Sequence, residues 1–252
     1  MQLSWNEYKA RASEDLASDG AFIYRGQRDA RWSLKTTLHR TALVSTVRDM
    51  KTYADVVLPQ VHEAIEAWVG RSWDLTNPLG MAEFVAFLQH NGFPTPLLDW
   101  TYSPYVAAYF AFESVNHFHP QIDEVAVFSF NKRSWTAAYR QVYDYADHTP
   151  HVSVLQPRMV GNHKLAVQQG CFTWSNVEDI EGHIRLNEKD GKHFLVKCTF
   201  DVRERPKVMR ELSLMGISAI QLMPSVEAVC KKALEDLIGL NSVGKKMSEV
   251  TP

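Results

Sequence analysis

An arginine at the end of a short apolar segment is the first residue whose setting indicates chemistry. Residues 21–24, Ala-Phe-Ile-Tyr, predict a strand that runs directly into Arg25, Gly26 and Gln27. A guanidinium at a strand end can bind a phosphate or carboxylate through two parallel hydrogen bonds. The neighbouring Gly26 would allow a bend or a close approach of the backbone. The alternative is a buried arginine that only ties the strand to the next loop.

A polar strand-to-helix turn is the second candidate segment. Residues 97–101, Leu-Leu-Asp-Trp-Thr, predict a short buried strand, and Ser103-Pro104 predicts the start of a helix. The free amides of that helix start, with the Ser103 hydroxyl, would form an anion site. Asp99 is costly to bury alone, and Arg25 is its obvious partner. The alternative is a capped helix with a structural Asp–Arg pair.

The elements that must position these residues follow from apolar periodicity and from turn residues. We expect one α+β domain over residues 1–240, with helices concentrated in the N-terminal half, a small mixed or antiparallel sheet, and a frayed tail at 241–252. The expected helices cover 5–18, 46–71, 81–91, 103–113, 209–215 and 226–238, and the further expected strands cover 125–130, 152–155, 171–174 and 193–200.

The charge balance argues against a general nucleic-acid binder. The net charge is −2, whereas such proteins usually carry a marked basic excess. One stretch departs from this mean, because residues 25–40 hold five cations against Asp29 alone, a local charge of about +4. This stretch is either a solvated basic face or a site for phosphates.

Cysteine and histidine spacing gives no metal or disulfide pattern. Cys171, Cys198 and Cys230 are odd in number and far apart. His117 and His119 could bind a metal, but a polar loop is the better interpretation, and we expect no metal. The chain has neither an apolar signal segment nor a stretch long enough to span a membrane, so we expect a cytoplasmic protein without a membrane partner.

The two candidate segments together resemble the FRG-domain family. The resemblance is carried by Tyr24-Arg25-Gly26, by residues 89–111 (QHNGFPTPLLDWTYSPYVAAYFA), by residues 168–172 (QQGCF) and by Leu222-Met223-Pro224. It covers residues 20–225. One departure is visible, since the family often has arginine where this chain has Pro96, so any anion contact of that arginine is either missing here or supplied by another basic residue.

The order of these segments is similar to that of ADP-ribosyltransferases. The resemblance implies an arginine on a first strand that holds NAD, a polar strand that leads into a helix and shapes the nicotinamide pocket, and a late glutamate or glutamine near the ribose. The residues implied for catalysis are Arg25, Asp99, Gln168 and Gln169. Those implied for binding the dinucleotide are Tyr24, Arg25, Gly26, Gln27, His90, Thr101, Ser103 and Tyr105.

The resemblance therefore implies an NAD-dependent transferase of the glycosyltransferase class, with NAD as its substrate. The basic stretch at 28–40 favours RNA as the macromolecular acceptor, with protein as the alternative. A toxin or phage-defence effector, restrained by an antitoxin-like protein, would fit such an activity. The alternative function is a non-catalytic module that binds a nucleotide or a partner in the same pocket.

Overall fold

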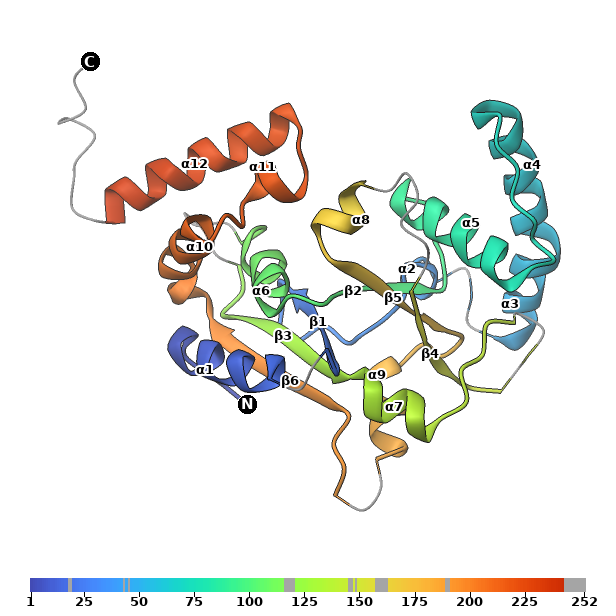
Figure 1. Cartoon of the computed structure of the whole chain (residues 1–252), viewed down its shortest axis with the longest axis horizontal. Coiled ribbons are helices and arrows are strands. Elements are labelled where there is room, and N and C mark those ends of the chain that lie inside the picture. Colours follow the sequence, from blue (N-terminus) through green and yellow to red (C-terminus); the bar gives the residue numbers. More distant parts are fainter. Residues whose placement is uncertain are drawn as a thin grey trace.

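A six-stranded antiparallel sheet lies at the centre of the protein in the computed structural model of the chain (Figure 1). The structure describes residues 1–17, 20–42, 44, 46–115, 121–144, 147, 149–156, 163–188 and 191–242. The strands are ordered β4-β5-β2-β1-β3-β6. Their bounds are β1 Phe22–Gln27, β2 Leu97–Thr101, β3 Glu124–Asn131, β4 Val152–Leu155, β5 Gly170–Ser175 and β6 Leu195–Asp201.

The sheet consists of two three-stranded halves that meet at one position. β1 pairs with β3 over its full length, from Phe22 opposite Asn131 to Gln27 opposite Ala126. Its pairing with β2 is recorded only at Tyr24 opposite Thr101. Beyond this pair β1 and β2 share no ladder, so the backbone groups that face the gap need other partners.

Helices α1 (Trp5–Leu16), α6 (Pro104–Phe112) and α10 (Arg205–Leu214) cover one face of the β1-β3-β6 half (Figure 1). α1 begins at Ser4, whose hydroxyl accepts from the Glu7 amide while Glu7 binds back to the Ser4 backbone. Trp5, Tyr8 and Ala12 then recur on one side of the helix and are buried. The amphipathic period of this segment thus places α1 on the sheet.

A helical arm covers the same face of the other half of the sheet. α3 (Val47–Thr52), a π-helical turn η1 (Tyr53–Val57) and α4 (Leu58–Val69) form one run, and α5 (Pro78–His90) follows. α4 ends at Gly70, which adopts a left-handed φ of +67°. These helices pack their apolar side chains against Leu97 and Trp174 of the sheet.

The opposite face carries a second layer with α7 (Lys132–Ala138) and α9 (Ile180–Leu186). Alternation along the strands separates the two layers, since Ile23 and Leu98 belong to this face while Tyr24 and Leu97 belong to the other. The remaining elements are α2 (Thr37–Arg40), α8 (His163–Val167), η2 (Val202–Glu204), α11 (Ala219–Leu222) and α12 (Val226–Ser242).

The expected α+β class is confirmed, and every recorded pairing between the strands is antiparallel. One expectation is wrong, since helices are not concentrated in the N-terminal half: α7 to α12 occupy the second half. Of the two roles expected for Gly26, a bend is excluded, because β1 continues through it to Gln27. Of the tail expected to fray, Asn241 and Ser242 lie in α12, and 243–252 lies outside the described residues. The domain limit at residue 240 stays a prediction.

No helix in the described ranges is long and apolar enough to cross a membrane. Cys171 and Cys198 are buried as free thiols, whereas Cys230 is exposed on α12. His117 and His119 lie outside the described residues. Among the residues that the structure describes, no three His, Cys, Asp or Glu side chains gather as metal ligands would.

Candidate functional site

The guanidinium of Arg25 lies in the gap where β1 and β2 part. Its Nη1 donates to the backbone carbonyl of Asp99 at 2.7 Å and lies 3.8 Å from the Asp99 carboxylate oxygen Oδ2. The contact with Nη1 gives the Asp99 carbonyl a hydrogen-bond donor. This carbonyl faces β1 and has no backbone partner there, because β1 and β2 form no ladder at this position. Arg25 thus has a structural role in the gap, and the expected pairing with Asp99 is made mainly through the backbone.

Arg25 keeps donor capacity beyond that role. Its side chain is only 15% exposed, and its Nε is buried without a hydrogen-bond partner among the described residues. Burial lowers the pKa of Arg25 to about 10, the like charge of Arg40 acts in the same direction, and Asp99 opposes them. The side chain therefore stays cationic at neutral pH with a buried N–H unused, and such groups are normally paired.

A cavity of about 340 Å³ opens beside this arginine. Its volume is at the small end of the range for ligand pockets. It lies between β1, β2 and α6, and Gln168, in the link between α8 and β5, closes it on one side. The lining consists of Tyr24, Arg25, Gly26, Asp99, Trp100, Thr101, Ala107, Phe110, Gln168 and Met223.

Gly26 allows β1 and α6 to enclose the cavity. A Cβ at this position would lie 1.9 Å from the Ala107 carbonyl oxygen and 2.6 Å from the Ala111 amide nitrogen. Both atoms belong to helix backbone and cannot move aside alone. The glycine of the Tyr-Arg-Gly segment is thus needed for close approach to α6, which is one of the two roles expected for it.

Thr101 links the turn before α6 to the segment before β5. Its hydroxyl accepts from the Ser103 amide at 3.0 Å and donates to the Gln168 carbonyl at 2.7 Å. Ser103 is the N-cap of α6, as expected, and its hydroxyl accepts from the Val106 amide. These bonds fix the turn but use the hydroxyls that the sequence offered to a ligand.

Gln168 reaches the cavity from the opposite side and contacts the C-terminal helices. Its Nε2 donates to the Leu222 carbonyl at 3.1 Å, next to the cavity residue Met223. Within the described ranges its Oε1 has no hydrogen-bond donor, so this oxygen remains available as an acceptor. Gln169, by contrast, is exposed in a left-handed conformation with φ of 49° and does not line the cavity.

Gln89 of α5 is a polar contact of the site that our sequence interpretation did not assign. Its Oε1 accepts from the hydroxyls of Thr37 at 2.9 Å and Thr95 at 2.5 Å. Two donors on one side orient the amide, and its Nε2 donates to Asp99 Oδ2 at 3.0 Å. The Asp99 carboxylate, 56% exposed, is therefore held at the cavity instead of being buried.

The order and spacing of these residues can be compared with known families. Residues 20–119 match the FRG domain. Neither the curated proteins nor the solved structures provide a match. The FRG segment contains Arg25, Asp99, Thr101 and α6, whereas Gln168 and Met223 complete the cavity from outside it.

Four residues expected to bind the dinucleotide do not line the cavity. Gln27 turns away and donates to the Ser33 carbonyl at 3.2 Å. His90 is exposed at the end of α5, and Ser103 caps α6. Tyr105 packs edge-on against Trp5, with ring centroids 6.1 Å apart. Tertiary contacts and the exact helix start decide these orientations, and neither is fixed by residue type.

The cavity also has an apolar side that the motifs did not reveal. Trp100, Ala107, Phe110 and Met223 line it. Trp100 is buried and donates from Nε1 to the Thr173 hydroxyl at 3.0 Å. An apolar residue that faces a cavity cannot be distinguished in sequence from one that faces a core. The spacing of apolar residues along α6 was the only sequence pattern that pointed to this side of the cavity.

The basic stretch of the FRG segment is partly neutralised. Arg31 pairs with Asp29 at 2.7 Å, and Lys35 pairs with Glu178 at 2.7 Å. The guanidinium of Arg28 lies over the ring of Trp32, 4.8 Å from its centroid. Trp32 is 44% exposed, so this stretch presents a cation stacked on an accessible indole.

Arg40 is a second basic residue of this region. It ends α2, its charge acts on Arg25, and the charge of Asp99 acts on it. Partial burial lowers the pKa of Arg40, while Asp99 raises it. An anion in this region would therefore meet two guanidinium groups although residue 96 is proline.

Proposed function

We propose that the protein is an ADP-ribosyltransferase-like enzyme that uses NAD as substrate and modifies a macromolecular acceptor. The observation that carries the proposal is the convergence of Arg25, Asp99, Thr101 and Gln168 on one cavity. They come from β1, β2 and the approach to β5, and β5, β2 and β1 are neighbours in the sheet. This is the arrangement expected if the three segments form one dinucleotide site.

The chemistry of the lining supports a ligand with both anionic and planar parts. The buried Nε of Arg25 is suited to a phosphate or ribose oxygen, and the nearby charge of Arg40 adds to its attraction. Phe110 and Met223 offer apolar surface to a ring. A cavity of about 340 Å³ would enclose the nicotinamide ribose end, with the remainder of the dinucleotide outside.

In the proposed reaction, the bond between nicotinamide and ribose C1′ breaks, and nicotinamide leaves with the electron pair. The acceptor nucleophile forms the new bond to C1′ and loses its proton. The transition state carries positive charge on the ribose, as in glycoside hydrolysis. Asp99 is the carboxylate of the lining and would stabilise this charge, while Gln168 Oε1 would orient a ribose hydroxyl.

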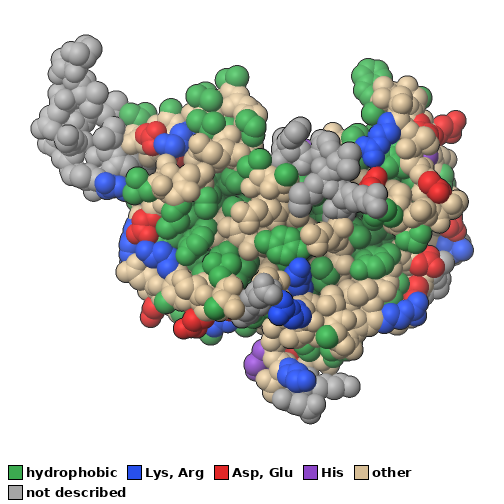
Figure 2. All heavy atoms as spheres, in the orientation of Figure 1, with side chains coloured by type: hydrophobic (Ala, Val, Ile, Leu, Met, Phe, Trp, Pro, Cys, Tyr) green, Lys and Arg blue, Asp and Glu red, His purple; other side chains and the backbone are tan. Residues whose placement is uncertain are grey.

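RNA is the acceptor that we favour. The Arg28–Trp32 stack combines a cation with an accessible aromatic ring, which suits unpaired bases and their phosphates. Figure 2 argues against a broad electrostatic footprint, because basic and acidic side chains are interspersed over the face that it shows. A local contact is therefore expected, and protein acceptors are the alternative.

The test is release of nicotinamide, and transfer of label from labelled NAD to total RNA or total protein. Arg25→Ala should lower the rate by about 10²–10³, the usual effect of removing a preorganised donor. Arg210→Ala, an exposed arginine on α10, is the matched control and should behave as wild type. Folded wild-type protein that releases no nicotinamide and transfers no label would contradict the proposal.

One observation favours a second function, a nucleotide-binding module without turnover. The Thr101 hydroxyl and the Gln168 amide nitrogen are both engaged in bonds within the protein. If they keep those bonds, the site can hold a ligand without reorganising around the ribose. This alternative predicts that wild type binds NAD without consuming it and that Arg25→Ala abolishes binding, as measured by calorimetry.

A further inference from the structure

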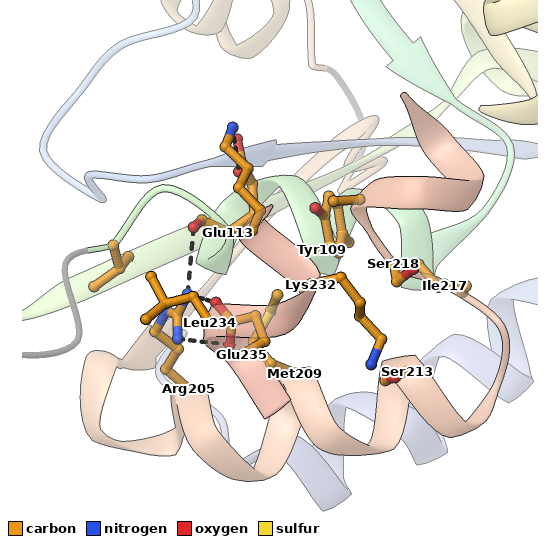
Figure 3. A pocket seen from close by; sticks show the side chains of 13 residues that line it. Tyr109, Glu113, Arg205, Met209, Ser213, Ile217, Ser218, Lys232, Leu234 and Glu235 are labelled. Atoms are coloured by element: carbon orange, nitrogen blue, oxygen red, sulfur yellow. Dashed lines mark hydrogen bonds and ion pairs between the residues drawn. The ribbon is translucent and has the colours of Figure 1, made fainter. Parts of the chain in front are cut away.

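A second cavity lies among the C-terminal helices (Figure 3). It has a volume of about 360 Å³ and is bounded by α6, α10, α11 and α12. Tyr109, Met209, Ile217 and Leu234 give it a largely apolar lining. No residue of this cavity lines the first one, so its contents would be a separate ligand.

Tyr109 supplies the polar group that points to a ligand. The residue is 2% exposed, and its hydroxyl makes no hydrogen bond to any part of the chain that the structure describes. Burial is the main cause that raises the pKa of Tyr109, and the charges of Glu113 and Glu235 add to it. The hydroxyl is therefore neutral, and it can donate to a group that enters the cavity.

The charged groups of the cavity, in contrast, already have partners. Arg205 is 4% exposed and binds the Phe112 and Glu113 carbonyls and both oxygens of Glu235. The dashed lines in Figure 3 mark the bonds of Arg205 to Glu113 and Glu235. Lys231 pairs with Glu113 at 3.5 Å, and Lys232 with Asp236 at 2.5 Å. A charged ligand would have to displace these pairs, whereas a neutral one would not.

We propose that this cavity binds a small neutral molecule, mainly apolar, with one carbonyl-type acceptor that receives the Tyr109 hydroxyl. The apolar lining provides the affinity, and the hydroxyl selects the acceptor. The inference does not depend on the proposed function, because binding here involves neither Arg25 nor NAD.

α11 connects such a ligand to the first cavity. Ala219, the first residue of α11, lines the second cavity. The Leu222 carbonyl at the other end accepts from Gln168, and Met223 lines the first cavity. A ligand that packs against Ala219 therefore stabilises the position of α11, which sets the position of the Leu222 carbonyl and of Met223 at the first site.

The test uses acetophenone as probe and ethylbenzene, its analogue without the carbonyl, as comparison. The methionine ε-methyl groups report on each cavity by NMR. We expect a saturable shift of the Met209 methyl with a dissociation constant on the order of 1 mM. Tyr109→Phe should weaken the binding of acetophenone about three- to tenfold and leave the binding of ethylbenzene unchanged, since only the hydrogen bond is lost. Tyr105→Phe, on the same helix but away from the cavity, should change neither.

Several results would overturn the inference. Acetophenone that causes no saturable shift of Met209 up to its solubility limit excludes the site. Equal weakening of both probes in Tyr109→Phe excludes the selecting role of the hydroxyl.

Ala219→Leu should fill the cavity, and an unchanged acetophenone shift in that folded variant would place the probe elsewhere. If the Ala219→Leu variant does not fold, the comparison of Tyr109→Phe with Tyr105→Phe decides whether acetophenone binds in this cavity. A Met223 methyl unmoved at saturation would exclude the stabilisation of α11.

Discussion

Asp99 shows how a single carboxylate can be positioned without being buried. Gln89 is oriented by two hydroxyl donors and offers its amide nitrogen to Oδ2, while Arg25 binds the backbone carbonyl of the same residue. The carboxylate is 56% exposed and lies beside the cavity. It is therefore suited to stabilise a cation in a transition state, for which a glutamine is a weaker choice.

Asp99→Asn is the corresponding prediction. The substitution keeps the shape and an oxygen for Gln89 but removes the negative charge. We expect kcat for nicotinamide release to fall about tenfold or more, with little change in the dissociation constant for NAD, because the charge matters mainly in the transition state. Gln168→Ala, in contrast, should change the KM for NAD in addition to kcat. Equal kcat values for Asp99→Asn and wild type would remove Asp99 from the proposed mechanism.

At the scale of elements, the ion pair between Arg205 and Glu235 ties α12 to the body of the protein, beside the more exposed pair of Lys231 and Glu113. Arg205 of α10 binds Glu235 of α12 and the carbonyls that end α6, so three helices meet at one guanidinium. Lys231–Glu227 and Lys232–Asp236 lie within α12 itself. The position of α11 and α12 beside the first cavity thus depends strongly on Glu235.

We expect Glu235→Ala to lower the free energy of unfolding by about 2–3 kcal/mol, because it leaves a buried charge without its carboxylate. Asp236→Ala removes an exposed pair on the next residue and should cost about 0–1 kcal/mol. Urea titrations of both variants give the comparison. Similar losses would mean that Arg205 is satisfied by the two carbonyls alone.

The elements that could be predicted are those with short-range signals. Ser103 and Pro104 start α6 as expected, and residues 97–101 form β2 with the expected bounds. The sequence did not decide between the two roles expected for Gly26, because a glycine that allows a helix backbone to approach closely has the same sequence pattern as a glycine in a bend. The short helices α7, α9 and α11 were missed, since four to seven residues carry little periodicity. Gln89 and Met223 depend on tertiary contacts that no local pattern contains.

For the whole molecule, three half-buried or buried histidines favour a neutral state. Burial lowers the pKa values of His39, His151 and His183 below the ordinary 6.5. Nδ1 of His151 lies 2.9 Å from the Thr149 carbonyl, while its Nε2 is buried without a partner among described residues. Protonation would place an unpaired N–H there, and the charge of His151 also disfavours protonation of His183.

The unfolded chain therefore binds more protons than the folded protein just below pH 6.5. The stability contributed by these histidines is fully present above that pH and is lost as the pH falls through the folded pKa values. We expect a lower melting temperature at pH 5.5 than at pH 7.5. A His151→Gln/His183→Gln variant should show a smaller difference between the two pH values, and an unchanged difference would assign the effect to other groups.

The Tyr24–Thr101 pair gives the sheet a mechanical property of its own. Because the two halves share a single rung, twisting one half against the other breaks only that rung and the Arg25–Asp99 contact, whereas a continuous ladder would resist along its whole length. The joint lies in the wall of the first cavity, since both residues line it. The span between Arg25 and Asp99 can therefore widen around a bulky guest while both cores of the molecule remain packed.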